Sequence, residues 1–488
     1  MKQIKEYFII ILLLVMPIIL ANIYYIDDIG RSTLGYRFWW EDGRPLSDIL
    51  MSVLMFSGTM ADIAPAPLLV ACAMLSWSFY RFGKEFFSNK KGLFLLPLSF
   101  LINPFNVEIL SYRFDSLTIL FSAVLSFAFL FTLSKNHYIN FLIKVALVIG
   151  VMCLYQASVN IILVFTSLLF FYDAYKLASP HEVIKLSFIR VLSTLLGLVI
   201  YMKVILPLTL KSAHSANHPR VSADLLNTVI SNLKSYYSYF EGIILPNGMG
   251  KFIIPALIVI SLLSALVISY RYLKVYKGKF GWIIFVISLI VVIVTPVSTI
   301  GSLLPLDNPM VGFSRLYIGV GSYLLFVLFL ATLAFKESKV PSLIVLPLYA
   351  YMFVFTCAYA NSSKHQYFVD TQIIDSIKED TKEFDYNTNY IIFNGGPPRS
   401  SILTNSSKNF PLLNRLVVSY FGNWMWAHYY LEINGLKQKD PGYNSEIVNS
   451  SLKEFCNYKL VTSNQDYKLY HKGVNIVIDF TRKSCLSN

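Results

Sequence analysis

Long apolar runs separated by short polar stretches recur along most of the chain. A helix needs roughly 20 mostly apolar residues to cross a bilayer, and about eleven runs meet this criterion. They lie near 7–25, 65–81, 93–110, 116–134, 139–157, 159–177, 188–208, 252–271, 281–299, 316–335 and 340–358. No small-residue cleavage site ends the first run, which favours an uncleaved helix over a signal peptide. The pattern predicts a polytopic α-helical membrane protein.

Composition agrees with this prediction. Hydrophobic residues make up 55% of the chain and charged residues only 14%, and the mean hydropathy is +0.57. A soluble protein is about a quarter charged, because its surface must be hydrated. The net charge of +13 does not indicate nucleic-acid binding, since the cations lie in short clusters between apolar runs. Much of the surface is therefore expected to face lipid.

The cationic clusters predict the orientation. They follow alternate spans, at Lys2 and Lys5, Arg81 to Lys91, Lys176 to Arg190, Arg271 to Lys279, and Lys336 and Lys339. The positive-inside rule makes this side, with the N-terminus, cytoplasmic. The loops 26–64, 111–115, 157–158, 209–251 and 300–315 then face the other compartment. An odd number of spans places residues 359–488 there as well.

The C-terminal region differs in composition from the rest of the chain. Residues 362–384 have a polar helical pattern, and 390–393 reads as a strand closed by a Gly-Gly-Pro-Pro turn. Three more strand-like runs follow, at 458–461, 467–470 and 474–480. We predict a transmembrane domain over 1–358, with a catalytic outer loop at 26–64, and a small extracytoplasmic α/β domain over 359–488.

Cysteine usage indicates one candidate disulfide. Cys72, Cys153 and Cys357 lie within or near the end of apolar runs and read as apolar packing residues. Cys456 and Cys485 lie in the polar C-terminal region, where an extracytoplasmic location would allow them to pair. The chain has no CxxC pair, so a zinc or redox motif has no support.

The first outer loop is the most informative stretch for chemistry. Four carboxylates, among them Asp27, Asp28 and Glu41, and three arginines lie within the 18 residues 27–44. A carboxylate can take a proton from an acceptor hydroxyl or hold a divalent ion. Arginine binds a phosphate leaving group bidentately, and Trp40 can stack on a sugar or anchor at the interface. The alternative is a solvated loop whose aspartates and arginines pair with each other.

Other outer segments carry further candidates. Arg113 and Asp115 either form a structural pair or add a phosphate-binding arginine and a second acid. Tyr155 and Gln156 can line a sugar pocket or simply pack, and Arg315, at the start of the tenth span, is a further phosphate candidate.

Three further sequence features, which are weaker indications of function, lie in the segments predicted to face the outer compartment. Trp424 and Trp426, in an aromatic stretch of the C-terminal region, can contact an acceptor sugar or belong to a core. The apolar positions of 46–60 predict a helix lying in the outer interface or packed on the C-terminal domain. His214 and His218 lack a third ligand and are a weak metal candidate.

Several of these segments together resemble a known family. They are Tyr24–Arg31, Trp40 with Gly43–Leu46, Tyr112–Ser116 and Tyr155–Ala157. Their sequence resembles the Gtr type-II glucosyltransferases, the serotype-converting enzymes of enteric bacteria and their phages. The resemblance spans nearly the whole chain, including Asn394–Gly396, although each motif is short.

The resemblance implies an inverting GT-C type enzyme of the bacterial inner membrane. The donor would be undecaprenyl-phosphate glucose on the periplasmic face, and the acceptor the O-antigen of lipopolysaccharide. A carrier flippase and a carrier glucosyltransferase would be further partners. Asp27 or Asp28 would match the catalytic acid, with Glu41 as the alternative. The carrier phosphate would be stabilised by arginines, of which the candidates are Arg31, Arg44, Arg113 and Arg315. Whether Mg²⁺ is required stays open, because GT-C members differ.

Two other functions fit the same pattern of spans. A lipid-linked-sugar flippase or transporter would place ionisable residues at mid-membrane in broken helices, whereas here the acids gather at one surface. An O-antigen polymerase or ligase shares the location and the substrate. No nucleotide-binding glycine motif is present, which disfavours nucleotide-driven transport by this chain.

Overall fold

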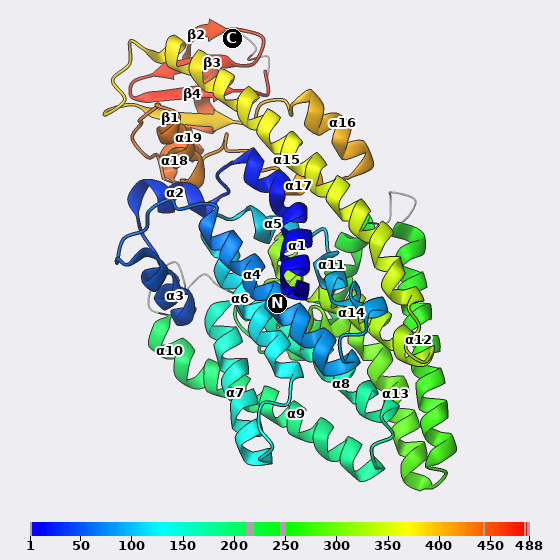
Figure 1. The fold of residues 1–488 in the computed structure, drawn as a ribbon. Coiled ribbons are helices and arrows are strands. Elements are labelled where there is room, and N and C mark those ends of the chain that lie inside the picture. Colours follow the sequence, from blue (N-terminus) through cyan, green and yellow to red (C-terminus); the bar gives the residue numbers. More distant parts are fainter. Residues whose placement is uncertain (1, 211–218, 245–249, 443–444, 483–484, 486–488) are drawn as a thin grey trace. The chain divides into compact units, whose positions relative to one another are not determined.

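The computed structural model describes residues 2–210, 219–244, 250–442, 445–482 and 485, and its chain path is drawn in Figure 1. The chain divides into two compact units. Unit 1 comprises Met1–Met16, Arg37–Thr59 and Ile63–Thr356. Unit 2 comprises Pro17–Tyr36, Met60–Asp62 and Cys357–Asn488. The loop 26–64 therefore contributes residues to both units.

Among the residues that the structure describes, eight helical segments are long and apolar enough to cross a membrane. They are α1 (Lys2–Ala21), α7 (His137–Leu154), α8 (Val159–Tyr175) with the 3₁₀ turn Gln156–Ser158, α9 (Pro180–Ile200) continued by the π-helical turn Tyr201–Ile205 and α10 (Leu206–Thr209), α12 (Gly250–Val275), α13 (Lys279–Ser298), α14 (Gly319–Ala334) with the 3₁₀ turn Ser314–Ile318, and α15 (Val340–Thr381). Each coincides with one of the predicted spans. The chain is thus mostly helical, with many apolar helices suited to a bilayer.

The other three predicted spans differ from this pattern. The segment 65–81 is the helix α4 (Ala66–Phe87), and 116–134 is the shorter helix α6 (Asp115–Leu130). The prediction of one helix over 93–110 is wrong. The structure has the 3₁₀ turns Lys91–Leu93 and Leu96–Leu101 followed by α5 (Asn106–Ser111). Pro97 and Pro104 disfavour a continuous helix here, since proline lacks the N–H that such a helix requires.

Unit 1 is organised around α14, whose side chains are nearly all buried. This helix packs against α8, α12 and the 3₁₀ turn Leu96–Leu101. Gly321 allows the closest approach, because a Cβ atom there would lie 2.1 Å from the Phe100 carbonyl oxygen. α7 packs against α6 and α9 in the same unit. The helix α11 (Leu225–Ile244) completes the described helices between α10 and α12.

The predicted interfacial helix is present as α3 (Pro45–Met55). Its apolar side chains Leu46, Ile49 and Val53 are 38%, 50% and 66% exposed, so one apolar face is left uncovered. An uncovered apolar face at helical spacing is what a helix lying in a membrane interface presents. The location of α3 in the interface stays a prediction.

Unit 2 contains a four-stranded sheet in the order β1-β4-β3-β2. The strands are β1 (Tyr390–Asn394), β2 (Lys459–Ser463), β3 (Lys468–Lys472) and β4 (Asn475–Asp479), as the sequence predicted. β1 pairs in parallel with β4, with Tyr390 opposite Asn475, and the other pairs are antiparallel. The α/β character predicted for the C-terminal region is confirmed.

Both faces of this sheet are covered. Ile391, Phe393, Ile476 and Ile478 pack with the isoleucines of α15, on one face. The alternate residues, Ile392 and Val477 among them, pack on the other face, as the two-residue period of a strand requires. The remaining helices of unit 2 are α2 (Asp27–Leu34), α16 (Ser401–Asn409), α17 (Leu413–Leu416), α18 (Met425–Ile433) and α19 (Glu446–Glu454).

Two further features of this region bear on the sequence predictions. The last apolar run and the polar helix predicted after it form one continuous helix, the 42-residue α15, which is the long yellow helix of Figure 1. Cys456 and Cys485 form a disulfide with their Cα atoms 5.2 Å apart, within the usual range. The predicted pairing is therefore present in the structure.

Candidate active site

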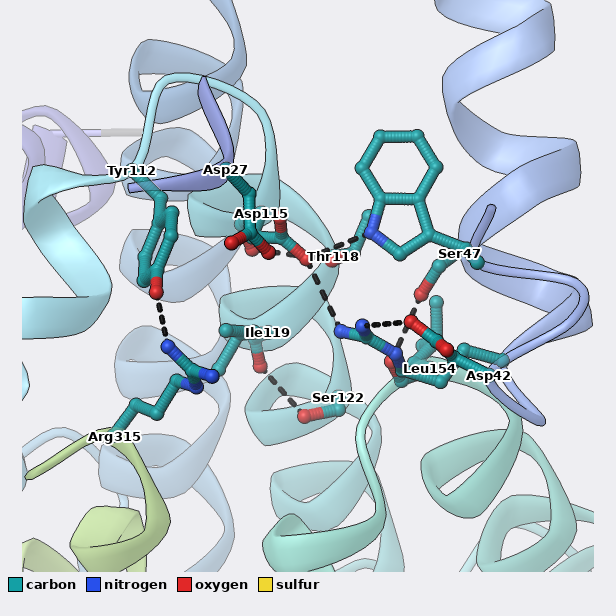
Figure 2. A network of polar contacts seen from close by, with 12 residues as sticks. Asp27, Asp42, Ser47, Tyr112, Asp115, Thr118, Ile119, Ser122, Leu154 and Arg315 are labelled. Atoms are coloured by element: carbon teal, nitrogen blue, oxygen red, sulfur yellow. Dashed lines mark hydrogen bonds and ion pairs between the residues drawn. The ribbon is translucent and has the colours of Figure 1, made fainter. Parts of the chain in front are cut away.

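A buried polar cluster in unit 1 centres on Asp115, the first residue of α6 (Figure 2). The Trp39 indole nitrogen donates a hydrogen bond to Asp115 Oδ1 at 2.7 Å. Arg44 Nη1 lies 3.1 Å from the same oxygen, and Arg44 Nη2 lies 3.2 Å from Asp42 Oδ2. Asp115 is 3% exposed and Trp39 is fully buried. One guanidinium therefore bridges two carboxylates in a setting that excludes most water.

The loop that carries Trp39 and Arg44 is held by contacts at Gly43. The Tyr201 hydroxyl donates to the Gly43 carbonyl at 2.8 Å, and Gln156 Nε2 donates to the Asp42 carbonyl at 3.0 Å. Gly43 has φ +75°, and a Cβ atom there would lie 2.7 Å from Leu206 Cδ1. Only glycine fits this position without strain. Gln156 thus positions the loop, and Tyr201 is a supporting residue that sequence reasoning missed.

A second cluster in unit 1 centres on Arg315, in the 3₁₀ turn before α14. Its backbone N–H donates to Glu108 Oε2 at 2.9 Å, and its Nη1 lies 3.1 Å from Glu108 Oε1. The guanidinium also contacts the Tyr112 hydroxyl, as Figure 2 shows, and lies over that ring. Glu108 lies outside the eight candidate spans. Burial raises the pKa of Glu108, and the Arg315 charge acts in the opposite direction.

The two adjacent acids of the predicted catalytic pair lie in unit 2, at the start of α2. Asp28 is fully buried and accepts a hydrogen bond from the Tyr25 backbone N–H at 3.3 Å. The Asp27 side chain is 26% exposed, and Arg31 Nη1 lies 3.8 Å from it. Asp27 is the more accessible of the two.

Many of the acidic side chains and arginines in the loop 26–64 form ion pairs with each other. Besides the Asp27–Arg31 and Asp42–Arg44 pairs, Arg37 Nε lies 3.2 Å from Asp48 Oδ1 on α3. Burial raises the pKa of Asp48, while the Arg37 charge lowers it. The alternative interpretation, in which the aspartates and arginines of this loop pair with each other, is thus partly correct. Arg44 is the exception, because its second carboxylate, Asp115, comes from α6.

The remaining candidates differ in how far they are buried. Trp40 is 43% exposed, and Glu41 and Arg113 are half-buried. Tyr155 is buried, and among the described residues its hydroxyl has no hydrogen-bond partner. In unit 2, Trp424 stacks on Tyr420 and Trp426 stacks on Tyr36, with ring centroids 6.2 and 6.4 Å apart.

No metal site emerges from the part of the chain that the structure describes. Within it, no group of three or more His, Cys, Asp or Glu side chains is placed to hold a metal ion. His214 and His218 lie outside the described residues.

Fold and site together define a polytopic helical protein with buried arginine–carboxylate clusters, the kind of site that can hold an anionic leaving group. The family model described as Glucosyl transferase GtrII matches residues 16–355, and the chain belongs to this family of glycosyltransferases. The match includes Asp27, Arg44, Asp115 and Arg315. A Salmonella phage P22 protein, described as an uncharacterized 55.3 kDa protein in the gtrB 5′ region, is 25% identical over 442 residues. The alignment covers 88% of this chain and 90% of that protein. No solved structure matches the chain.

Proposed function

We propose that this protein transfers glucose from undecaprenyl-phosphate glucose to the O-antigen of lipopolysaccharide at the periplasmic face of the bacterial inner membrane. The observation that carries the proposal is the family match over residues 16–355, because it includes both buried arginine clusters. The relative from phage P22, named for its place beside gtrB, supports a role in the same process.

The disulfide supports the periplasmic side. Disulfides form and persist in oxidising compartments such as the bacterial periplasm and are rare in the cytosol. Cys456 and Cys485 are bonded and lie in unit 2. The positive-inside pattern of the short loops favours the same orientation.

The proposed reaction is a single displacement with inversion. A carboxylate removes the proton from an acceptor hydroxyl, whose oxygen attacks the anomeric carbon as the bond to the carrier phosphate breaks. The candidates for this base are Asp27, Asp28 and Glu41. Unit 1 by itself holds two guanidiniums suited to the departing phosphate, Arg44 and Arg315. Their carboxylate partners hold them in place before a substrate binds. Arg31 and Arg113 stay further candidates, and metal dependence stays open.

The test is glucosylation of O-antigen in cells that express single variants Asp27→Asn, Asp28→Asn and Glu41→Gln. Removing a general base lowers the rate by about 10²–10⁴-fold, so one variant should lose glucosylation, measured by mass spectrometry of the released polysaccharide. Asp62→Asn is the matched control in the same loop and should keep it.

Three results would contradict the proposal. Full glucosylation in every one of the three acid variants would show that the base lies elsewhere. Movement of a polyprenyl-phosphate sugar between leaflets of proteoliposomes, without glucose transfer, would indicate a flippase. A change in O-antigen chain length without added glucose would indicate a polymerase.

A further inference from the structure

Unit 2 contains a pocket that no candidate residue of the proposed reaction lines. It lies between the polar half of α15, the segment Ile23–Tyr25 and the stretch Leu416–Tyr420. All three of these segments belong to unit 2.

Two polar side chains of α15 in the pocket wall are held by their surroundings. Gln366 Nε2 donates to Asp370 Oδ1 at 2.7 Å, and the Ser400 backbone N–H donates to Gln366 Oε1 at 2.8 Å. Asp370 and Gln366 are only 2% and 3% exposed. Since both ends of the Gln366 carboxamide are hydrogen-bonded, it and the carboxylate are fixed in one orientation. A rigid pair of this kind is suited to selecting a ligand by its hydroxyl pattern.

Two hydroxyl groups in the pocket wall have unused hydrogen-bonding capacity. Tyr430 is 2% exposed and Ser363 is 5% exposed. Among the described residues, neither hydroxyl has a hydrogen-bond partner. A buried polar group without a partner costs stability, so native proteins rarely keep one without a reason. Two of them in one pocket point to a bound polar ligand that satisfies both.

Aromatic rings form the rest of the wall. The Tyr430 ring stacks on Tyr420 with centroids 4.4 Å apart, and Tyr367 meets Tyr430 edge-on at 6.0 Å. Rings of this kind present an apolar face beside a polar tip. A sugar ring has the same combination, with apolar C–H groups beside hydroxyl groups.

The charge of the pocket disfavours an anion. Asp370 places a carboxylate in the wall, and Arg399, which interacts electrostatically with it, donates its Nη1 to the Val417 carbonyl at 3.0 Å. Among the described residues that line the pocket there is no lysine or arginine to hold a phosphate, whereas a neutral polyol can hydrogen-bond to the Asp370 side chain.

We propose that this pocket binds one neutral sugar residue of the acceptor glycan, through Ser363, Gln366, Asp370 and Tyr430. The assignment to the acceptor rests on the proposed function. The pocket would select the acceptor by the hydroxyl pattern of that residue, and it would do so before any glucose is transferred.

The test is direct binding to the full-length protein in detergent, without donor. Saturation-transfer NMR is recorded with the methyl α-glycosides of rhamnose, mannose, galactose and N-acetylglucosamine. The wild type should bind at least one of them. Asp370→Asn, Tyr430→Phe and Ser363→Ala should each weaken that binding by about tenfold, the loss of one hydrogen bond to a buried group. Asp375→Asn, on the same helix, and Tyr470→Phe, in the sheet, are the controls and should bind normally.

The outcomes separate this inference from the proposed function. The inference about the pocket is wrong if the wild-type protein binds none of the glycosides. It is also wrong if all three pocket variants bind as tightly as the wild type, or if the two control variants lose as much binding as the pocket variants. Competition by inorganic phosphate or by polyprenyl-phosphate glucose would assign the pocket to the donor and would overturn it too. Should Asp370→Asn fail to fold, the other two variants, which delete one oxygen atom each, decide the question. Binding without glucose transfer in cells would contradict only the proposed function.

Discussion

The Trp39 indole donates its N–H to Asp115 Oδ1 at 2.7 Å, joining the loop that follows α2 to the start of α6 in unit 1. Both side chains are buried, so this bond and the Arg44 contact satisfy a carboxylate that water cannot easily reach. The pair fixes where the Arg44 guanidinium lies. The hydrogen bond between Trp39 and Asp115 is therefore the first contact to test.

Trp39→Phe should destabilise unit 1. The substitution keeps the aromatic ring but removes a donor from a buried carboxylate, at a cost of about 1–3 kcal/mol. We expect a lower apparent melting temperature in detergent and weaker glucosylation in cells. Trp282→Phe is the control, because Trp282 is 56% exposed. An unchanged melting temperature for Trp39→Phe would show that the indole bond is not needed.

Arg315→Ala should be more damaging than the double variant Arg315→Ala/Glu108→Gln. The single change leaves a buried carboxylate without its cation, which costs about 3–5 kcal/mol, whereas the second change removes the orphaned charge. A double-mutant cycle on unfolding in detergent measures the coupling. Additive effects of the two substitutions would contradict a direct interaction.

The same pair predicts a pH dependence in Arg315→Ala. Burial raises the pKa of Glu108 above its ordinary 4.5, and this variant loses the charge that opposes the rise. The folded protein then binds the proton more tightly than the unfolded chain does. Stability therefore falls as the pH rises from 4.5 through the raised value. The deficit relative to wild type should be smaller at about pH 5 than at about pH 8, as thermal unfolding at the two values would show. A larger deficit at the lower pH would refute this reasoning.

Gly43→Ala should displace the loop that carries Arg44. A side chain at φ +75° is strained by about 1–2 kcal/mol, and the added Cβ would lie 2.7 Å from Leu206 Cδ1. A Cβ atom at Gly58 would meet no other atom within 4 Å, so Gly58→Ala is the matched control. We expect glucosylation to fall in the first variant and not in the second. Equal activity would mean that the loop tolerates movement.

Loss of the disulfide should destabilise unit 2 alone. Cys456 and Cys485 are 29 residues apart, and closing a loop of that length is worth about 3.5 kcal/mol in the chain-entropy description. Cys456→Ser should therefore increase proteolysis of the C-terminal region, while Cys357→Ser, which changes a free cysteine, should not. Maleimide labelling in intact cells gives a second measurement. Labelling of Cys456 without prior reduction would show that the bond does not form in cells.

The sequence by itself determined the features that depend on local patterns. An apolar run long enough for a bilayer is visible without any partner segment, and so are the short strand-like runs that became 390–394 and 475–479. Pairing of Cys456 with Cys485 was also predictable, because few cysteines lie in the polar region. The cluster of acids and arginines in 27–44 marked the loop, although it did not say which of them pair with each other.

Only the tertiary structure decided which distant residues meet. Asp115 is 71 positions from Arg44 and Glu108 is 207 from Arg315, and no local pattern links such positions. The break at 93–110 also needed tertiary packing, since Pro97 and Pro104 permit a kinked helix as well as the observed 3₁₀ turns. The pocket around Asp370 is lined by residues from opposite ends of the chain. Buried charges such as Asp115 and Glu108 are tolerable only where a partner satisfies them, and for these two residues folding supplies that partner from a distant segment.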